Sequence, residues 1–170
     1  ELGNMSIVEL LLQGKTTTPA DLVKDLPGDN EAKAETIDNN LQHEIVKKMS
    51  SNPEYYVKLS EMLKKIIMQR KVAAMSYQEY LKQVVEMAEA ILHPEDNGDY
   101  PDEVKNSAAR RALFDYFEED LELTVDVDGA IRIAIRPAWK KNRQKQQKIR
   151  LAIYEKLLLH SYSKDKAEEE

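Results

Sequence analysis

Apolar residues in the middle of the chain recur with the period of an α-helix, and they form two separate runs within residues 52–92. Positions three and four apart lie on the same side of a helix, so each run predicts one amphipathic helix with a single buried face. The first face carries Tyr55, Leu59, Met62, Leu63, Ile66 and Ile67, and the second carries Tyr77, Tyr80, Leu81, Val84, Ala88, Ile91 and Leu92. Two such faces can bury each other in a helical hairpin.

The residues that precede each run mark where its helix begins. Ser51 or Asn52 can cap the first helix, and Pro53 suits its first position because the N–H that proline lacks has no partner there. Ser76 followed by Glu79 is a capping box, in which hydroxyl and carboxylate each satisfy a free backbone N–H. The pattern therefore predicts two helices joined by a short turn at residues 73–75.

Five further segments show helical spacing. Residues 29–49 and 142–157 predict long helices with one apolar face each, and residues 107–117 predict a shorter one. Two pieces near the start, 5–13 and 19–26, are too short to be stable alone, because isolated helices of that length are marginal in water. We expect both to pack against the longer helices.

The pattern over residues 121–135 fits two different structures. Leu121, Leu123, Val125 and Val127 alternate before Asp128-Gly129, and Ile131, Ile133 and Ile135 alternate after it. That arrangement is typical of a β-hairpin with a type I′ turn. The segment also carries a helical stripe of Leu123, Val127, Ala130, Ile131 and Ala134. Gly129 would cost that helix only about 1 kcal/mol, and a two-stranded ribbon alone is marginal in water, so periodicity leaves both structures open.

Length and composition favour a single domain without covalent or metal support. A chain of 170 residues can bury roughly 70% of its unfolded surface, and with no cysteine it has neither disulfides nor thiolate metal sites. We predict an all-α protein, a single multi-helix bundle built around the central hairpin, with a short β-hairpin near 121–135 as the local alternative. Residues 1–28 are expected to form a helical lead-in, 29–160 the bundle, and 161–170 a charged, frayed tail.

The start of the chain and its apolar runs limit the class of protein. No apolar run approaches the ~20 residues that span a bilayer, and no signal-peptide pattern opens the chain, so we expect a soluble protein. The first residue is Glu1 rather than Met, and the apolar helical pattern of residues 7–12 begins without a start signal. We interpret both features as the sign of a fragment of a longer protein. The net charge of -6 argues against a generally basic coat for nucleic acid.

Three short motifs resemble nucleotide or metal chemistry but lack the context that this chemistry needs. Gly14-Lys15-Thr16 matches the end of a phosphate-binding loop, yet Glu9 stands where that loop needs another glycine. Two Glu-x-Lys triplets, 31–33 and 103–105, resemble half of a metal-dependent nuclease motif, but neither is predicted on a strand beside another aspartate. We therefore predict no catalytic and no cofactor-binding residue.

The histidines and the acidic loop do not form a metal-binding pattern. His43, His93 and His160 are far apart, and none is at the spacing of metal ligands. The stretch 95–99 lacks the alternating oxygen ligands and the closing glutamate of a calcium-binding loop. We predict no metal site and interpret the stretch as a solvated turn.

The charges in the C-terminal third form two blocks of opposite sign. Residues 115–128 carry only acidic charges, and residues 132–150 carry only basic ones. Such blocks either steer a partner or pair with each other. The candidate partner-binding residues, for a protein or for DNA phosphate, are Trp139, Lys140, Lys141, Arg143, Lys145 and Lys148. The alternative is a solvated basic face with Trp139 in the core.

An ordered series of short stretches runs through about residues 20–160. It consists of Ala34-Glu35-Thr36-Ile37-Asp38-Asn39-Asn40, Asn52-Pro53-Glu54-Tyr55-Tyr56 with Leu59-Ser60-Glu61, Ser76-Tyr77 with Glu79-Tyr80-Leu81, Tyr100-Pro101, Ala109-Arg110-Arg111-Ala112-Leu113-Phe114-Asp115, Trp139 with Asn142, and Ala152-Ile153-Tyr154. The series resembles the C-terminal helical region of the R subunit of type I restriction enzymes. The chain departs from that family at Asp128-Gly129, where the family has helix-favouring residues, and at Lys140-Lys141, where it has Arg-Gly.

The resemblance implies that this chain is the end of a motor and endonuclease subunit. The other domains of that subunit use ATP and Mg²⁺ to translocate duplex DNA and cleave it. The helical end is thought to attach the subunit to the methyltransferase core. The resemblance thus implies a helix at 121–135, a methyltransferase (modification) subunit as the partner, DNA bound through the full complex, and a cytoplasmic location. Our second hypothesis is a helical DNA-binding module that uses the basic block 132–150.

Overall fold

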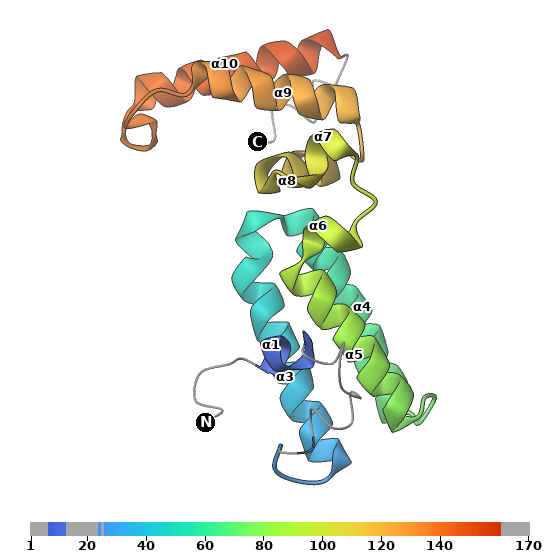
Figure 1. Ribbon diagram of the computed structural model, residues 1–170. Coiled ribbons are helices and arrows are strands. Elements are labelled where there is room, and N and C mark those ends of the chain that lie inside the picture. The colour runs from blue at the N-terminus through green and yellow to red at the C-terminus, as the bar shows by residue number, and fades with distance from the viewer. Residues whose placement is uncertain (1–6, 13–23, 25, 161–170) are drawn as a thin grey trace. The chain divides into compact units, whose positions relative to one another are not determined.

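A computed structural model describes residues 7–12, 24 and 26–160, and all regular structure in these residues is helical, which confirms the all-α prediction (Figure 1). The α-helices are α1 (Ile7–Leu12), α3 (Asn30–Lys48), α4 (Pro53–Lys71), α5 (Tyr77–Leu92), α6 (Pro94–Asn97), α7 (Asp102–Lys105), α8 (Ala108–Tyr116), α9 (Leu121–Ala134) and α10 (Arg143–Leu159), and the 3₁₀ helices are η2 (Met49–Ser51) and η3 (Trp139–Lys141). They belong to two compact units, Glu1–Asp99 and Tyr100–Glu170. The sequence predicts one bundle over residues 29–160, whereas the contacts divide this range between Asp99 and Tyr100.

The central helical hairpin is confirmed, and both helices begin at the predicted caps. Asn52 Oδ1 accepts a hydrogen bond from the Tyr55 N–H at 3.3 Å. Ser76 Oγ accepts one from the Glu79 N–H at 3.1 Å. In the turn between the helices, Ala73 takes a left-handed conformation with φ 53°. Local hydrogen bonding therefore determines where α4 and α5 begin, as the sequence predicts.

The first unit has one apolar core to which α1, α3, α4 and α5 all contribute. Its most deeply buried side chains include Val8, Leu11, Ile37, Leu41, Ile45, Leu63, Tyr80, Leu81, Val84 and Ile91. Two tyrosines tie the start of α4 to the end of α5. The Tyr55 hydroxyl donates to Ala90 O at 2.9 Å, and the Tyr56 hydroxyl donates to Ile91 O at 3.2 Å. The six-residue α1 contributes to this core rather than standing alone, as its length requires.

Two short helices connect α5 to α8, and the first of them occupies part of the stretch 95–99, for which the sequence predicts a solvated turn. α6 occupies Pro94–Asn97, and α7 follows at Asp102–Lys105. Proline at the first position of α6 and acidic residues in the first turn of both helices favour these starts. Pro94 cannot continue α5, which ends at Leu92, and it begins the next helical turn.

The segment 121–135 is a helix, so the β-hairpin alternative is wrong. Asp120 caps α9, and its Oδ1 accepts a hydrogen bond from the Leu123 N–H at 2.9 Å. Leu123 and Val127, one helical turn apart, are both fully or almost fully buried. The buried residues of this segment are Leu123, Thr124, Val127 and Asp128, which follow the period of a helix and not the alternation of a strand. Their burial outweighs the low helix propensity of Gly129.

Replacing Gly129 by alanine is expected to stabilise the protein by about 1 kcal/mol, because glycine costs that much in a helix interior. A Cβ at this position would meet no heavy atom within 4 Å, so it adds no strain. The midpoint of urea unfolding measures the effect. Gly28→Ala is the matched control and should destabilise, because Gly28 has φ +95° and its Cβ would lie 2.7 Å from the Ala32 Cβ. A loss of stability in Gly129→Ala would contradict the helix.

Some predicted features lie outside the described residues, namely the Gly14-Lys15-Thr16 motif, most of the piece 19–26 and the tail 161–170. The two Glu-x-Lys triplets are described: 31–33 lies in the first turn of α3, and 103–105 lies in α7. Across the described part of the chain, no helix is both long enough and apolar enough to cross a bilayer.

Candidate interaction surface

The second unit is organised around a hairpin of α9 and α10, with α7 and α8 packed against α9 (Figure 1). Its apolar core consists of the buried Phe117, Leu123, Val127 and Leu157, with Leu113, Tyr116, Ile131 and Ile153 packed around them. These residues join the start of α9 to the end of α10. The opposite end of the hairpin, residues 135–148, contributes nothing to that core, and we call it the hairpin tip.

A buried carboxylate joins α8 to α9 in this unit. The Asp128 side chain is 5% exposed, and its Oδ2 accepts hydrogen bonds from Arg110 Nε at 2.6 Å and from Arg132 Nε at 2.8 Å. Burial alone would raise the pKa of Asp128, but the hydrogen bonds from Arg132 and Arg110 outweigh it and lower the pKa. Asp128 and Arg132 form an ion pair between the acidic and the basic block.

A second acidic side chain of α9 faces α10. Asp126 Oδ2 lies 3.2 Å from His160 Nε2 and 3.3 Å from Lys156 Nζ. The contacts with His160 and then Lys156 hold the pKa of Asp126 below its ordinary value. The two helices are thus joined at the core end of the hairpin by polar contacts as well as by apolar packing.

The hairpin tip is held together mainly by hydrogen bonds to its own backbone. Arg136 Nη1 donates to Ile133 O at 2.5 Å and closes the end of α9. Lys145 Nζ donates to Pro137 O at 2.6 Å, across the connection. Asn142 caps α10, because its Oδ1 accepts a hydrogen bond from the Lys145 N–H at 3.0 Å. The tip therefore has a defined conformation without a core of its own.

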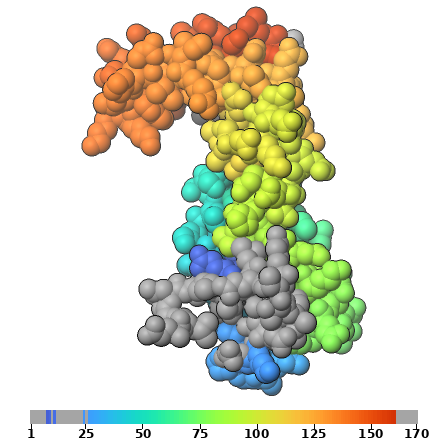
Figure 2. Space-filling view, viewed as in Figure 1, coloured from blue at the N-terminus to red at the C-terminus, as the bar shows by residue number. Residues whose placement is uncertain are grey.

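The structure brings the six predicted partner-binding residues together on this tip and the first turns of α10. Trp139 is half-buried and belongs to neither apolar core, so it does not fill the core as the alternative prediction requires. Lys140 Nζ lies 5.9 Å from the centre of its ring. Lys141, Arg143 and Lys148 are exposed and form no ion pair within the described residues. In Figure 2 the tip, in orange, stands clear of α7 and α8.

Sequence reasoning missed the exposed aliphatic side chains of the same hairpin. Half of the large apolar side chains that are exposed in the described chain belong to it, namely Ile133, Ile135, Leu151, Leu158 and Leu159. Leu151 and Leu158 are 54% and 51% exposed and stand seven residues apart, which is the signal that could have identified them. The surface combines unpaired positive charge with apolar area, and this combination can bind a partner.

The first unit contains a buried polar network that periodicity does not reveal. Asp38 Oδ1 accepts a hydrogen bond from the Tyr80 hydroxyl at 2.7 Å, and Asp38 Oδ2 accepts one from Arg70 Nη2 at 2.8 Å. Arg70 Nη1 also lies 2.6 Å from Glu31 Oε1, and its guanidinium lies 5.2 Å from the centre of the Tyr80 ring. Burial raises the pKa of Tyr80 far above its ordinary value, so its hydroxyl stays a donor. The network joins α3, α4 and α5 and has a structural role.

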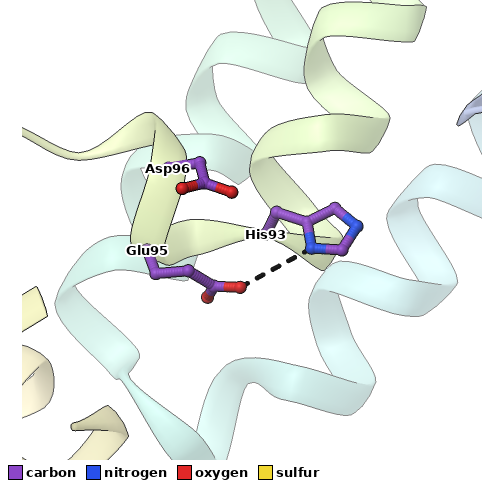
Figure 3. Close-up of side chains that lie close together, drawn as sticks. All are labelled: His93, Glu95 and Asp96. Carbon is purple, nitrogen blue, oxygen red and sulfur yellow. Dashed lines mark ion pairs between the residues drawn. The ribbon is translucent and has the colours of Figure 1, made fainter. Parts of the chain in front are cut away.

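One group of side chains has the composition of a metal site. His93, Glu95 and Asp96 lie at the junction of α5 and α6, with ligand atoms all within 4.8 Å of one another (Figure 3). One nitrogen and two carboxylate ligands suit a borderline divalent ion such as Zn²⁺. However, the His93 side chain is 53% exposed, and its Nδ1 already lies 3.6 Å from Glu95 Oε1. The group comes from a single turn and needs no metal to explain it.

Comparisons of this chain with protein-family models, with curated proteins and with solved structures find no match. The described residues form an all-helical protein whose second unit has an exposed, basic and partly apolar hairpin.

Proposed function

We propose that this chain is the C-terminal helical docking domain of a type I restriction enzyme R subunit. In this proposal it attaches the ATP-dependent translocase and endonuclease to the methyltransferase core, and it carries out no chemical step itself. ATP and Mg²⁺ belong to the other domains of the parent subunit. The proposal begins from the ordered series of residues that resembles the family along residues 20–160.

One observation carries the proposal: residues from separate stretches of the series hydrogen-bond to each other across the fold. Asp38, from the first stretch, binds the hydroxyl of Tyr80, which lies 42 residues later in another stretch. The Tyr100 hydroxyl donates to Asp115 Oδ2 at 2.6 Å and joins two further stretches. The residues on which the resemblance rests therefore supply contacts that hold each unit together.

The character of the exposed surface favours a protein partner over DNA. Lys141 and Arg143 could neutralise DNA phosphates, but the exposed Leu151 and Leu158 have no favourable interaction with a charged phosphate backbone. Protein interfaces combine an apolar centre with a charged rim, which is the composition of this hairpin. Docking through α10 and the hairpin tip uses both kinds of side chain.

The experiment mixes the 170-residue chain with the cognate modification subunits at low salt and measures the affinity calorimetrically. We expect a stable complex. Lys141→Glu with Arg143→Glu should weaken it at least about 10-fold, because reversing rim charges opposes a complementary surface. Lys64→Glu with Lys65→Glu, exposed lysines on α4, is the matched control and should bind normally. Failure of the unaltered chain to bind would overturn the proposal.

A helical DNA-binding module is the second candidate, and the unpaired cations of the hairpin tip are the observation that favours it. In this case nonspecific duplex DNA should be retarded by the chain at low salt, and the shift should fade steeply as salt rises. The same Lys141→Glu with Arg143→Glu variant should abolish the shift. Absence of any shift at low salt removes this candidate.

A further inference from the structure

The outer face of α10 carries a second stripe of side chains, opposite the one that packs on α9. Ile149 and Leu157, which are both buried, mark the inner face. The outer stripe follows the a and d positions of two heptads: Gln144, Gln147, Leu151, Tyr154 and Leu158. α10 packs on α9 and η3, and the two leucines of the stripe remain more than half exposed.

The positions that flank this stripe are mostly basic. In the same heptad register the e and g positions are Arg143, Lys148, Arg150 and Glu155, with the buried Leu157 completing the set. Arg143, Lys148 and Arg150 are exposed and form no ion pair within the described part of the chain. Charges at e and g choose the partner of a helix seam, so three basic flanks call for acidic flanks on the other helix.

We propose that the outer face of α10 binds an amphipathic helix of a partner protein, with apolar residues in the seam and acidic residues beside it. This inference deepens the proposed function, because it names the segment that the methyltransferase core would supply. A second copy of this chain fits poorly, because it would bring mostly basic flanks against basic flanks. The pair of glutamines in the first heptad sets the register, since polar seam residues prefer to face polar ones.

The first test uses the whole chain and two synthetic helical peptides of about 21 residues, with leucine at a and d. One peptide carries glutamate at e and g, and the other carries lysine there. Fluorescence anisotropy at low salt should show the acidic peptide binding at least about 10-fold tighter, with the ratio shrinking as salt rises. Equal binding of the two peptides, or tighter binding of duplex DNA that displaces the acidic one, would overturn the proposal.

Variants of the chain locate the binding face. Leu151→Glu with Leu158→Glu should weaken the acidic peptide at least about 10-fold, because it puts like charge against the partner and removes the apolar seam. Leu159→Glu is the matched control, because Leu159 is 74% exposed but lies outside the a, d, e and g positions of the seam. This variant should bind the acidic peptide within about 2-fold of the unaltered chain. Circular dichroism checks that each variant folds. If the glutamates disturb the hairpin, Leu151→Ala with Leu158→Ala should show a smaller loss.

The same variants separate this inference from the proposed function. If the modification subunits bind the seam variant as tightly as the unaltered chain, the seam is not the docking face, while the docking function survives. If the modification subunits do not bind but the acidic peptide binds through Leu151 and Leu158, the seam is real and the restriction-enzyme function falls. If neither binds, both proposals fall.

Discussion

Replacing Asp38 by alanine is expected to lower the free energy of unfolding by about 3–5 kcal/mol, the usual cost of removing one partner from a buried ion pair. Asp38 and Arg70 have side chains that are 8% and 6% exposed, so neither the guanidinium nor its partner can turn to water without unpacking the helices. Burial alone would lower the pKa of Arg70, but hydrogen bonds to Glu31 and Asp38 outweigh it and raise the pKa.

The loss is large because the substitution removes the buried carboxylate that two groups share. The guanidinium of Arg70 keeps Glu31, whose side chain is 61% exposed, and the hydroxyl of Tyr80 keeps only the Ala34 carbonyl oxygen as acceptor, at 3.0 Å. A buried charge or hydroxyl without its partner retains the full cost of desolvation. α3 would keep one polar contact with α4, through the exposed Glu31, and one with α5, through the Ala34 carbonyl.

Urea unfolding at pH 7 measures the effect, and Glu31→Ala is the control. It removes the other carboxylate from the same guanidinium, but because Glu31 is mostly exposed we expect a change below about 1 kcal/mol. Tyr80→Phe should fall between the two, at about 1–3 kcal/mol, because the buried hydroxyl that donates to Asp38 and to the Ala34 carbonyl is lost. If Asp38→Ala and Glu31→Ala had equal effects, the network would not stabilise the fold as described.

The second large effect is expected for Asp128→Ala, with a loss of about 2–3 kcal/mol at pH 7. Both arginines bind Asp128 Oδ2, so one substitution removes the link between α8 and α9. The cost is smaller than for Asp38 because the side chains of Arg110 and Arg132 are 28% and 60% exposed and can return to water. Glu122→Ala, an exposed acid on the same helix, should change stability little.

The contribution of Asp128 should depend on pH in a defined direction. Its pKa is lowered in the folded protein from an unfolded value of about 3.9, so the unfolded chain takes up the proton first as pH falls. The stabilisation is therefore fully present above about pH 5 and is lost as pH falls through the folded pKa. The difference in unfolding free energy between the unaltered chain and Asp128→Ala should shrink from pH 7 to pH 3. A difference that is constant with pH would exclude the ionised carboxylate as the cause.

Local signals predicted most helix positions because the chemistry that starts a helix lies within a few residues. Asn52, Ser76 and Asn142 each cap the helix that the sequence assigns to them. The same reasoning is incomplete where one residue type can either end a helix or begin one. Pro94 ends one helix and begins another, and the sequence alone predicts only the ending.

The candidate surface was predicted in part. The run of basic residues along 132–150 is visible in the sequence, and their gathering at the hairpin tip follows from the position of the turn. The apolar half of the surface was not predicted, because the helical pattern assigns one apolar face to 142–157 and does not show whether leucines outside that face are covered. Ile149 and Leu157 are buried, whereas Leu151 and Leu158 are exposed.

The sequence by itself determined the helical class, the central hairpin and the opposed blocks of charge, because caps, periodicity and charge are properties of neighbouring residues. The tertiary structure decided three things that depend on distant residues. It made 121–134 a helix, because adjacent residues, Leu123 with Thr124 and Val127 with Asp128, are buried on one side. It paired Asp38 with Arg70 and Tyr80, which lie 32 and 42 residues further along the chain. It also placed a boundary between Asp99 and Tyr100, because the contacts on either side gather around separate cores.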